Sequence, residues 1–335
     1  MAVKKIKVWT TGLLALILAV VLSACGADGK NAENKEGQAS SQQPGQTVTA
    51  QEPPGKTVYP LTVKDATGQE FTFKKAPDKI VSVSPAETEA LFAIGLDKEI
   101  VGVSDYSDYP EAATKKPKVG GIMKPNEEAI IAANPEVVFA GISLSEQATT
   151  KLRDMGIMIF KTEPKTVEDV IANIELYGKI TDHQKEARAV TDKMRADVAE
   201  VKEGVKNIGK GQKLRVYVEF SPGWTVGKGE FMDELITLAG GENVGATQKG
   251  WYQISEENII AANPDVILYS KSVKDDKTGQ SLGDIIKARS GWDQISAVRN
   301  NRVFAVDDNL ISRPGPRVTE GLKEVAKGVY PEIFK

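Results

Sequence analysis

Histidine and cysteine are nearly missing from this 335-residue chain, which has one residue of each type. A zinc site built from cysteine and histidine needs several such ligands, and a nucleophilic Cys–His pair needs both residues in one place. His183 stands alone at the start of a predicted helix, away from the expected binding site. The composition therefore excludes these sites and histidine-rich metal cages, and we expect neither a resident metal nor a cofactor.

A surplus of positive charge is missing as well. The chain has 43 lysines and arginines against 46 aspartates and glutamates, a formal net charge of −3, whereas nucleic-acid-binding domains carry a basic stripe. The segment GWTVGK at residues 223–228 lacks the spacing of a phosphate-binding loop. No pair of carboxylates is set apart by its spacing as a general acid and base. The sequence therefore predicts no nucleic-acid partner and no enzymatic activity.

An apolar run near the N-terminus, residues 13–22, is shorter than the roughly 20 residues that a transmembrane helix needs. Three lysines lie among the first seven residues, and Leu22-Ser23-Ala24 precedes Cys25. This pattern resembles the bacterial lipobox, in which the cysteine receives a lipid and becomes the mature N-terminus. We predict a signal peptide over residues 1–24 and a lipid anchor at Cys25. The alternative is an ordinary signal peptide cleaved near Ala24.

Residues 25–57 contain almost no large apolar side chain and are rich in Gly, Ser, Gln, Asn and Pro. Such a segment buries too little surface to offset the entropy of ordering it. We predict a flexible tether between the lipid and the folded body.

One stretch of the folded body occurs twice. EEAIIAANPEV at residues 127–137 recurs as EENIIAANPDV at residues 256–266. Asn126 and Ser255 precede the two copies as helix caps, and the glutamate pair of each copy lies in a first turn, where the helix dipole favours anions. Asn-Pro ends each helix, and a β-branched apolar run follows. The repeat predicts two related halves.

Strands and helices alternate through both halves, which is the pattern of parallel sheets. The apolar runs fit strands that are covered on both faces. Between the halves, Thr181 to Gln184 has the form of a capping box, and apolar residues then recur at spacings of three and four. We expect one α/β lobe over residues 58–180, a bridging helix over 181–208, about 40 Å long, and a second lobe over 209–335.

Several motifs together carry a family likeness. They are SPAETE at 84–89, YSDYP at 106–110, the two glutamate-bearing repeats, GGEN at 240–243, and the GW…AV…RV series from residue 291 to 303. From about residue 79 to the C-terminus, the chain resembles the iron-complex and cobalamin substrate-binding proteins of ABC importers. The resemblance implies the class III periplasmic-binding-protein fold, in which two Rossmann-like lobes flank a cleft and one rigid helix joins them. It also implies a monomeric receptor, anchored on the extracytoplasmic face of the cell membrane, that serves a permease and its ATPase.

The expected cleft residues are aromatic side chains in loops and one arginine. Flat rings in loops cover a large planar ligand at low entropic cost. Tyr106 and Trp251 match aromatic cleft positions of cobalamin-binding members of the family, and Trp224 falls where those members have a phenylalanine. Tyr252 is a further cleft candidate, although packing inward explains it equally well. Arg313 either pairs with an anionic ligand or is a solvated loop charge.

The cargo has two candidate classes. Tyr106, Trp224 and Trp251 favour cobalamin. Ile122 and Gly141 stand where cobalamin-binding members have tryptophans, and Ser312 stands where they have a glutamate, which favours an iron(III)–siderophore or haem. In either case the bound molecule is a transported metal chelate.

Glu128 and Glu257 match the paired glutamates that, in this family, meet arginines of the permease. Carboxylates and guanidinium groups form bidentate, charge-assisted hydrogen bonds, and two distant contacts fix an orientation. First-turn glutamates that only complement the helix dipole are the alternative. Glu127 and Glu256 are the neighbouring candidates for the same contacts.

Overall fold

The computed structural model describes residues 55–334. The predicted signal peptide, Cys25 and nearly all of the predicted tether lie outside this range. Among the described residues, no helix combines the length and the apolar character that a membrane span requires.

The first half of the folded body is built on a four-stranded parallel sheet in the order β4-β3-β5-β6. Its strands are β3 (Ile80–Ser82), β4 (Ile100–Val103), β5 (Val137–Ala140) and β6 (Ile159–Lys161). Its helices are α1 (Pro85–Ala93), α2 (Glu111–Thr114), α3 (Glu127–Ala133), α4 (Glu146–Asp154) and α5 (Val167–Thr181). The antiparallel hairpin of β1 (Leu61–Lys64) and β2 (Glu70–Phe73) joins this lobe through Asp65, whose carboxylate accepts a 3.0 Å hydrogen bond from the Lys161 amide.

The second half has its own four-stranded parallel sheet, in the order β12-β11-β7-β9. Its strands are β7 (Arg215–Glu219), β9 (Glu242–Asn243), β11 (Val266–Ser270) and β12 (Val303–Val306). Its helices are α7 (Phe231–Leu238), α8 (Glu256–Ala262), α9 (Leu282–Ala288), α10 (Ser296–Arg299), α11 (Asp308–Ser312) and α12 (Val318–Val329). Strands β8 (Trp224–Val226) and β10 (Trp251–Gln253) form a separate antiparallel pair.

The two copies of the repeat fold alike, one in each sheet. The Asn126 side chain accepts a hydrogen bond from the Ala129 amide, and the Ser255 side chain accepts one from the Asn258 amide, so both predicted caps are confirmed. Each helix ends at an asparagine in the left-handed region, Asn134 with φ 45° and Asn263 with φ 43°, a conformation that asparagine tolerates better than most residues. The prolines that follow prevent the helices from continuing.

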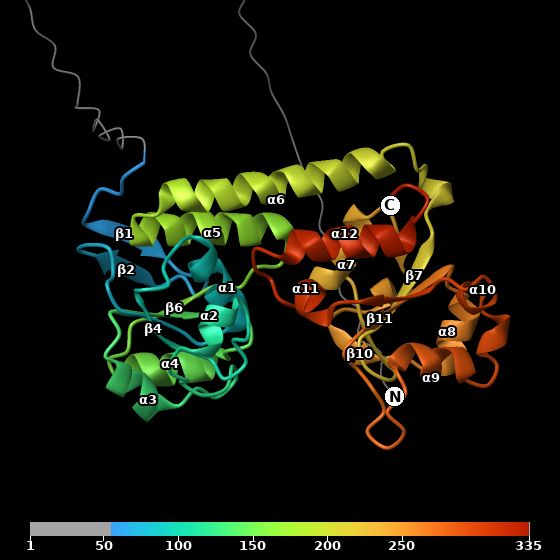
Figure 1. The fold of residues 1–335 in the computed structure, drawn as a ribbon, viewed down its shortest axis with the longest axis horizontal. Coiled ribbons are helices and arrows are strands. Elements are labelled where there is room, and N and C mark those ends of the chain that lie inside the picture. The colour runs from blue at the N-terminus through green and yellow to red at the C-terminus, as the bar shows by residue number, and fades with distance from the viewer. Residues whose placement is uncertain (1–54, 335) are drawn as a thin grey trace, which may run out of the picture. The chain divides into compact units, whose positions relative to one another are not determined.

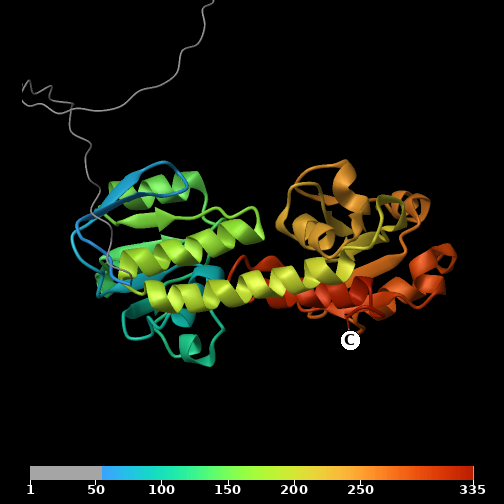
Figure 2. The same cartoon turned by 90° about the horizontal axis from the view of Figure 1, so that it is seen from above.

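Helix α6 (Gln184–Val205) has 22 residues and spans about 33 Å. Figures 1 and 2 show it running along both lobes, and it packs on α5 and α1 of the first lobe and on α12 and α7 of the second. At its middle, Asp197 accepts a 2.9 Å hydrogen bond from Thr319 of α12.

The predicted start of this helix is wrong. Thr181 is the last residue of α5 and donates its hydroxyl to the Tyr177 carbonyl, so it caps nothing. Asp182 turns the chain with a φ of 62°, and α6 begins at Gln184 without a side-chain cap. Two helices therefore meet at a tight corner where the sequence pattern indicated a capping box.

Candidate functional site

A cavity of about 310 Å³ lies between the lobes. Its first wall comes from the segments that follow β3, β4 and β5, and its second wall from α11 and the loop after it. In parallel α/β sheets, ligands bind beyond the carboxyl ends of the strands. The cavity therefore lies where this fold places a ligand, and it includes two of the predicted residues, Tyr106 and Arg313.

Tyr106 lies in the loop after β4 and is 61% exposed. Its amide donates a 3.2 Å hydrogen bond to the Ser104 hydroxyl, and the Ser107 amide donates to the Ser104 carbonyl at 3.0 Å. These bonds hold a turn that leaves the phenol ring at the cavity surface. The geometry suits a ring that covers part of a ligand.

Trp224 and Trp251 lie on the β8–β10 pair and do not line this cavity. Trp251 is opposite Val226 and Trp224 is opposite Gln253, so the two indoles are diagonal neighbours on one face. They are 39% and 43% exposed, and Trp251 meets Phe220 edge to face with ring centroids 5.1 Å apart. The sequence predicted that both tryptophans lie in loops and missed the strand pairing, which brings the two separate aromatic residues together as one exposed aromatic platform.

Tyr252 points to the opposite face of this pair, together with the buried Thr225. Its hydroxyl donates a 2.8 Å hydrogen bond to the Gly245 carbonyl. The structure thus gives Tyr252 an inward, structural contact, while the two tryptophans remain available.

Arg313 is neither a solvated loop charge nor an unpaired cation. Its Nη1 donates to Glu89 at 3.1 Å and to Asp108 at 2.6 Å, which joins the loop after α11 to the first lobe. The hydrogen bond from Arg313 lowers the pKa of Asp108. Both carboxylates must be displaced, or shared, before Arg313 can bind an anion.

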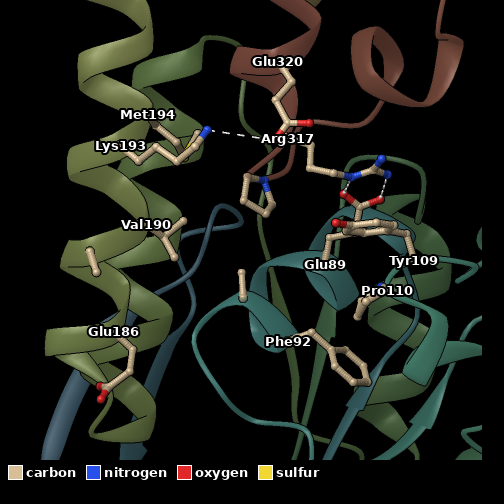
Figure 3. Close-up of a pocket in the computed structure, with 13 residues that line it drawn as sticks. Glu89, Phe92, Tyr109, Pro110, Glu186, Val190, Lys193, Met194, Arg317 and Glu320 are labelled. Atoms are coloured by element: carbon tan, nitrogen blue, oxygen red, sulfur yellow. Dashed lines mark hydrogen bonds and ion pairs between the residues drawn. The ribbon is translucent and has the colours of Figure 1, made fainter.

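Arg317 completes this interlobe ion cluster of Glu89, Asp108, Arg313 and Arg317. Its Nε and Nη2 bind the two carboxylate oxygens of Glu89 at 2.9 and 2.7 Å, and its guanidinium lies 3.8 Å from the centre of the Tyr109 ring. Figure 3 shows the paired Glu89–Arg317 bonds above this ring, at the edge of a second hollow beside α6. The Glu89 side chain is 1% exposed, whereas that of Asp108 is 58% exposed, so the cluster connects the lobes through a buried glutamate and an exposed aspartate.

Glu87, a residue of the cavity wall, was missed by the sequence analysis. It is 2% exposed, and burial raises the pKa of its carboxyl group. A detectable indication was present, because Glu87 and Glu89 are two positions apart and so lie on nearly opposite sides of α1, where they cannot form one polar face toward solvent. Acidic residues within such a helix have to be buried and partnered.

The repeat helices present their glutamates outward. Glu128 and Glu257 are exposed, whereas Glu127 is paired with Lys151. At the start of α8, the backbone amide of Glu257 and the Ser255 hydroxyl lower the pKa of the Glu257 carboxyl. Both Glu128 and Glu257 are therefore available for contacts with another molecule.

Ser281 lies in the segment GQSLG at residues 279–283, which has the Gly-x-Ser-x-Gly spacing of hydrolase nucleophiles. Its hydroxyl caps α9, accepting from the Asp284 amide at 3.1 Å and donating to the Asp284 carboxylate at 2.6 Å. Ser281 thus serves as a helix cap. The single histidine, His183, lies before α6, and its Nδ1 is 2.7 Å from the Thr181 carbonyl oxygen.

The chain matches the family described as "Periplasmic binding protein" over residues 80–310. It is 34% identical over 342 residues to an uncharacterized ABC transporter substrate-binding lipoprotein, YvrC, of Bacillus subtilis, with 99% of each chain covered. Among solved structures, it resembles a possible iron-binding, periplasmic solute-binding protein from Staphylococcus epidermidis, with 30% identity, a TM-score of 0.65, and 76% and 100% of the two chains covered. It also resembles the periplasmic vitamin B12 binding protein BtuF of Vibrio cholerae, with 25% identity, a TM-score of 0.67, and 76% and 97% covered.

The chain belongs to the periplasmic binding protein family and is a substrate-binding protein of an ABC transporter. The predicted family and the predicted class III α/β fold are confirmed. Proteins of this family bind solutes and are not enzymes.

Proposed function

We propose that this protein captures a corrinoid between its lobes and delivers it to its permease. One observation carries the choice of cargo. Among the residues that line the cavity, Glu87 is the one carboxylic acid and Arg313 is the one strong base. Burial favours the neutral form of Glu87. Arg313 is paired with Glu89 and Asp108. A wall without unpaired charge suits the amide-rich edge of a corrinoid better than the carboxylates of haem.

An iron(III)–siderophore is the second candidate. Ile122 and Ser312 line the cavity. The resemblance to cobalamin-binding members implies a tryptophan at the first position and a glutamate at the second. The Staphylococcus epidermidis relative is named as possibly iron-binding. Calorimetric titration with cyanocobalamin, a ferric trihydroxamate and haemin separates the candidates. We expect the strongest binding for cyanocobalamin, and binding of the ferric chelate alone would overturn this assignment.

The rest of the transport assembly follows from the family role. Glu128 and Glu257 would contact arginines of the permease, and an ATPase would drive release of the cargo. A lipid on Cys25 and the tether that follows would hold the monomeric receptor on the extracytoplasmic face of the membrane. Labelling of cells with a radioactive fatty acid tests the anchor, because Cys25→Ser should abolish incorporation into this protein.

The aromatic platform supplies a direct test of ligand binding. Trp251→Ala should raise the Kd for cyanocobalamin at least tenfold, about 1.4 kcal/mol, because we take this exposed indole, although it lies outside the wall of the interlobe cavity, to cover an apolar face of the large ligand. The measurement is calorimetric titration of the purified protein.

Tyr252→Phe is the matched control. It removes a hydroxyl that contacts Gly245 on the opposite face of the β8–β10 pair, so the Kd should stay within about twofold. An unchanged Kd for Trp251→Ala would remove the platform from the binding site.

A further inference from the structure

The carboxyl group of Glu87 has one bonded oxygen and one oxygen without a partner. Thr162 donates its hydroxyl to Oε1 at 3.0 Å, and the Tyr177 hydroxyl lies 2.9 Å from the same threonine oxygen. Because Thr162 has a single hydroxyl proton and gives it to Glu87, Tyr177 must donate to Thr162. Oε2 is buried and, among the described residues, has no hydrogen-bond partner.

The surroundings of Glu87 favour a neutral acid. Burial raises the pKa of this carboxyl, the charge of Glu89 on the same helix raises it further, and the nearby hydroxyl groups of Ser84 and Thr162 act in the opposite direction. The arginine across the cavity, Arg313, is already bonded to Glu89 and Asp108. Tyr177 of α5 is fully buried, and its pKa is raised well above the ordinary value, so it stays neutral. When Thr162 donates to Oε1, the proton of the neutral acid lies on Oε2.

Gly141 leaves room for this oxygen at the end of β5. A Cβ atom at position 141 would lie 2.6 Å from Glu87 Oε2 and 2.8 Å from the Ser84 hydroxyl. Glu87, Ser84 and the two residues after Gly141 all line the interlobe cavity. The unpaired O–H group therefore lies beside the cavity wall, at the position where a side chain would otherwise stand.

We propose that Glu87 is a specificity-determining residue that, as a neutral carboxylic acid, donates its Oε2 proton to an amide or carbonyl oxygen on the edge of the bound ligand. This inference rests on the proposed function, because it takes the cavity to be the cargo site. A buried donor without a partner is destabilising, and a ligand oxygen that accepts its proton removes this free-energy cost. A ligand without such an acceptor leaves the donor unpaired and therefore binds more weakly.

Two substitutions separate donation from packing. Glu87→Gln keeps the shape, an acceptor for Thr162 and a donor in place of Oε2, whereas Glu87→Met keeps the volume without a donor. For cyanocobalamin, Gln should leave the Kd within roughly threefold and Met should raise it about tenfold, about 1.4 kcal/mol. The wild-type affinity should fall as the pH rises through the raised pKa of Glu87, because ionisation removes the donated proton, and Gln should abolish this pH dependence.

Infrared spectroscopy tests the protonation state without a ligand. The difference spectrum of wild type minus Glu87→Gln should show the C=O band of a protonated carboxyl group at neutral pH, and this band should shift when cyanocobalamin is added. Absence of the band, or a wild-type Kd in Glu87→Met, overturns the role of Glu87 while leaving the proposed function intact. Failure of the wild-type protein to bind cyanocobalamin overturns the proposed function, and with it this role.

Discussion

Glu128→Ala combined with Glu257→Ala should abolish transport of the ligand into cells while leaving the Kd of the purified receptor unchanged. The two carboxylates are exposed at the starts of α3 and α8, one in each lobe, and away from the interlobe cavity. Loss of one partner from a close charge pair at an interface typically costs 2–5 kcal/mol, and here two pairs would be lost together. Uptake of labelled ligand and calorimetric titration provide the two measurements.

A matched control uses first-turn glutamates of other helices. Glu111 in α2 and Glu320 in α12 are also exposed and acidic. Their double substitution by alanine removes the same number of negative charges from first turns of helices, so uptake should remain normal. If the Glu128/Glu257 variant transports as well as this control does, the glutamates serve only their helices, which was the alternative raised by the sequence.

Glu89→Gln should lower the free energy of unfolding by about 3 kcal/mol, which corresponds to a fall in Tm of about 6–12 °C. The Glu89 side chain is 1% exposed, and the two arginine side chains that it binds are 15% and 18% exposed. Without the carboxylate, Arg317 loses its ion-pair partner, and Arg313 keeps only Asp108. Removing one partner of a buried ion pair is expensive because the remaining charge stays desolvated.

Differential scanning calorimetry measures this effect, and Glu320→Gln is the comparison. Glu320 is half exposed and lies 4.0 Å from Lys193, visible as the other ion pair in Figure 3, so its loss should change stability by no more than about 0.5 kcal/mol. Equal Tm values for the two variants would show that the interlobe ion cluster contributes little to stability.

The interlobe ion cluster also helps to fix the position of one lobe relative to the other. They are joined through α6, through the ion cluster, and through the Val167 amide, which donates a 2.7 Å hydrogen bond to Glu234 of α7. Connections at separate places constrain the angle between the lobes more than one helix would. We therefore expect Glu89→Gln to weaken ligand binding as well, through a less well-defined cavity.

Local signals in the sequence predicted much of the fold. Both repeat helices start at the predicted caps, and each is followed by a largely buried strand of a parallel sheet, as the apolar run after each copy predicted. These features depend on residues a few positions apart, because caps, turns and apolar periodicity act within one or two turns of the chain.

The sequence by itself determined the family, the α/β character and the outward glutamates of the repeat. Only the tertiary structure decided which groups meet in the cavity. Arg313 finds Glu89 across 224 positions of the chain, and the direction of Tyr252 depends on strand pairing with β8. Burial by the surrounding walls likewise raises the pKa of Glu87. The physical reason is that charge pairing and desolvation depend on distance in space, which local sequence patterns do not encode.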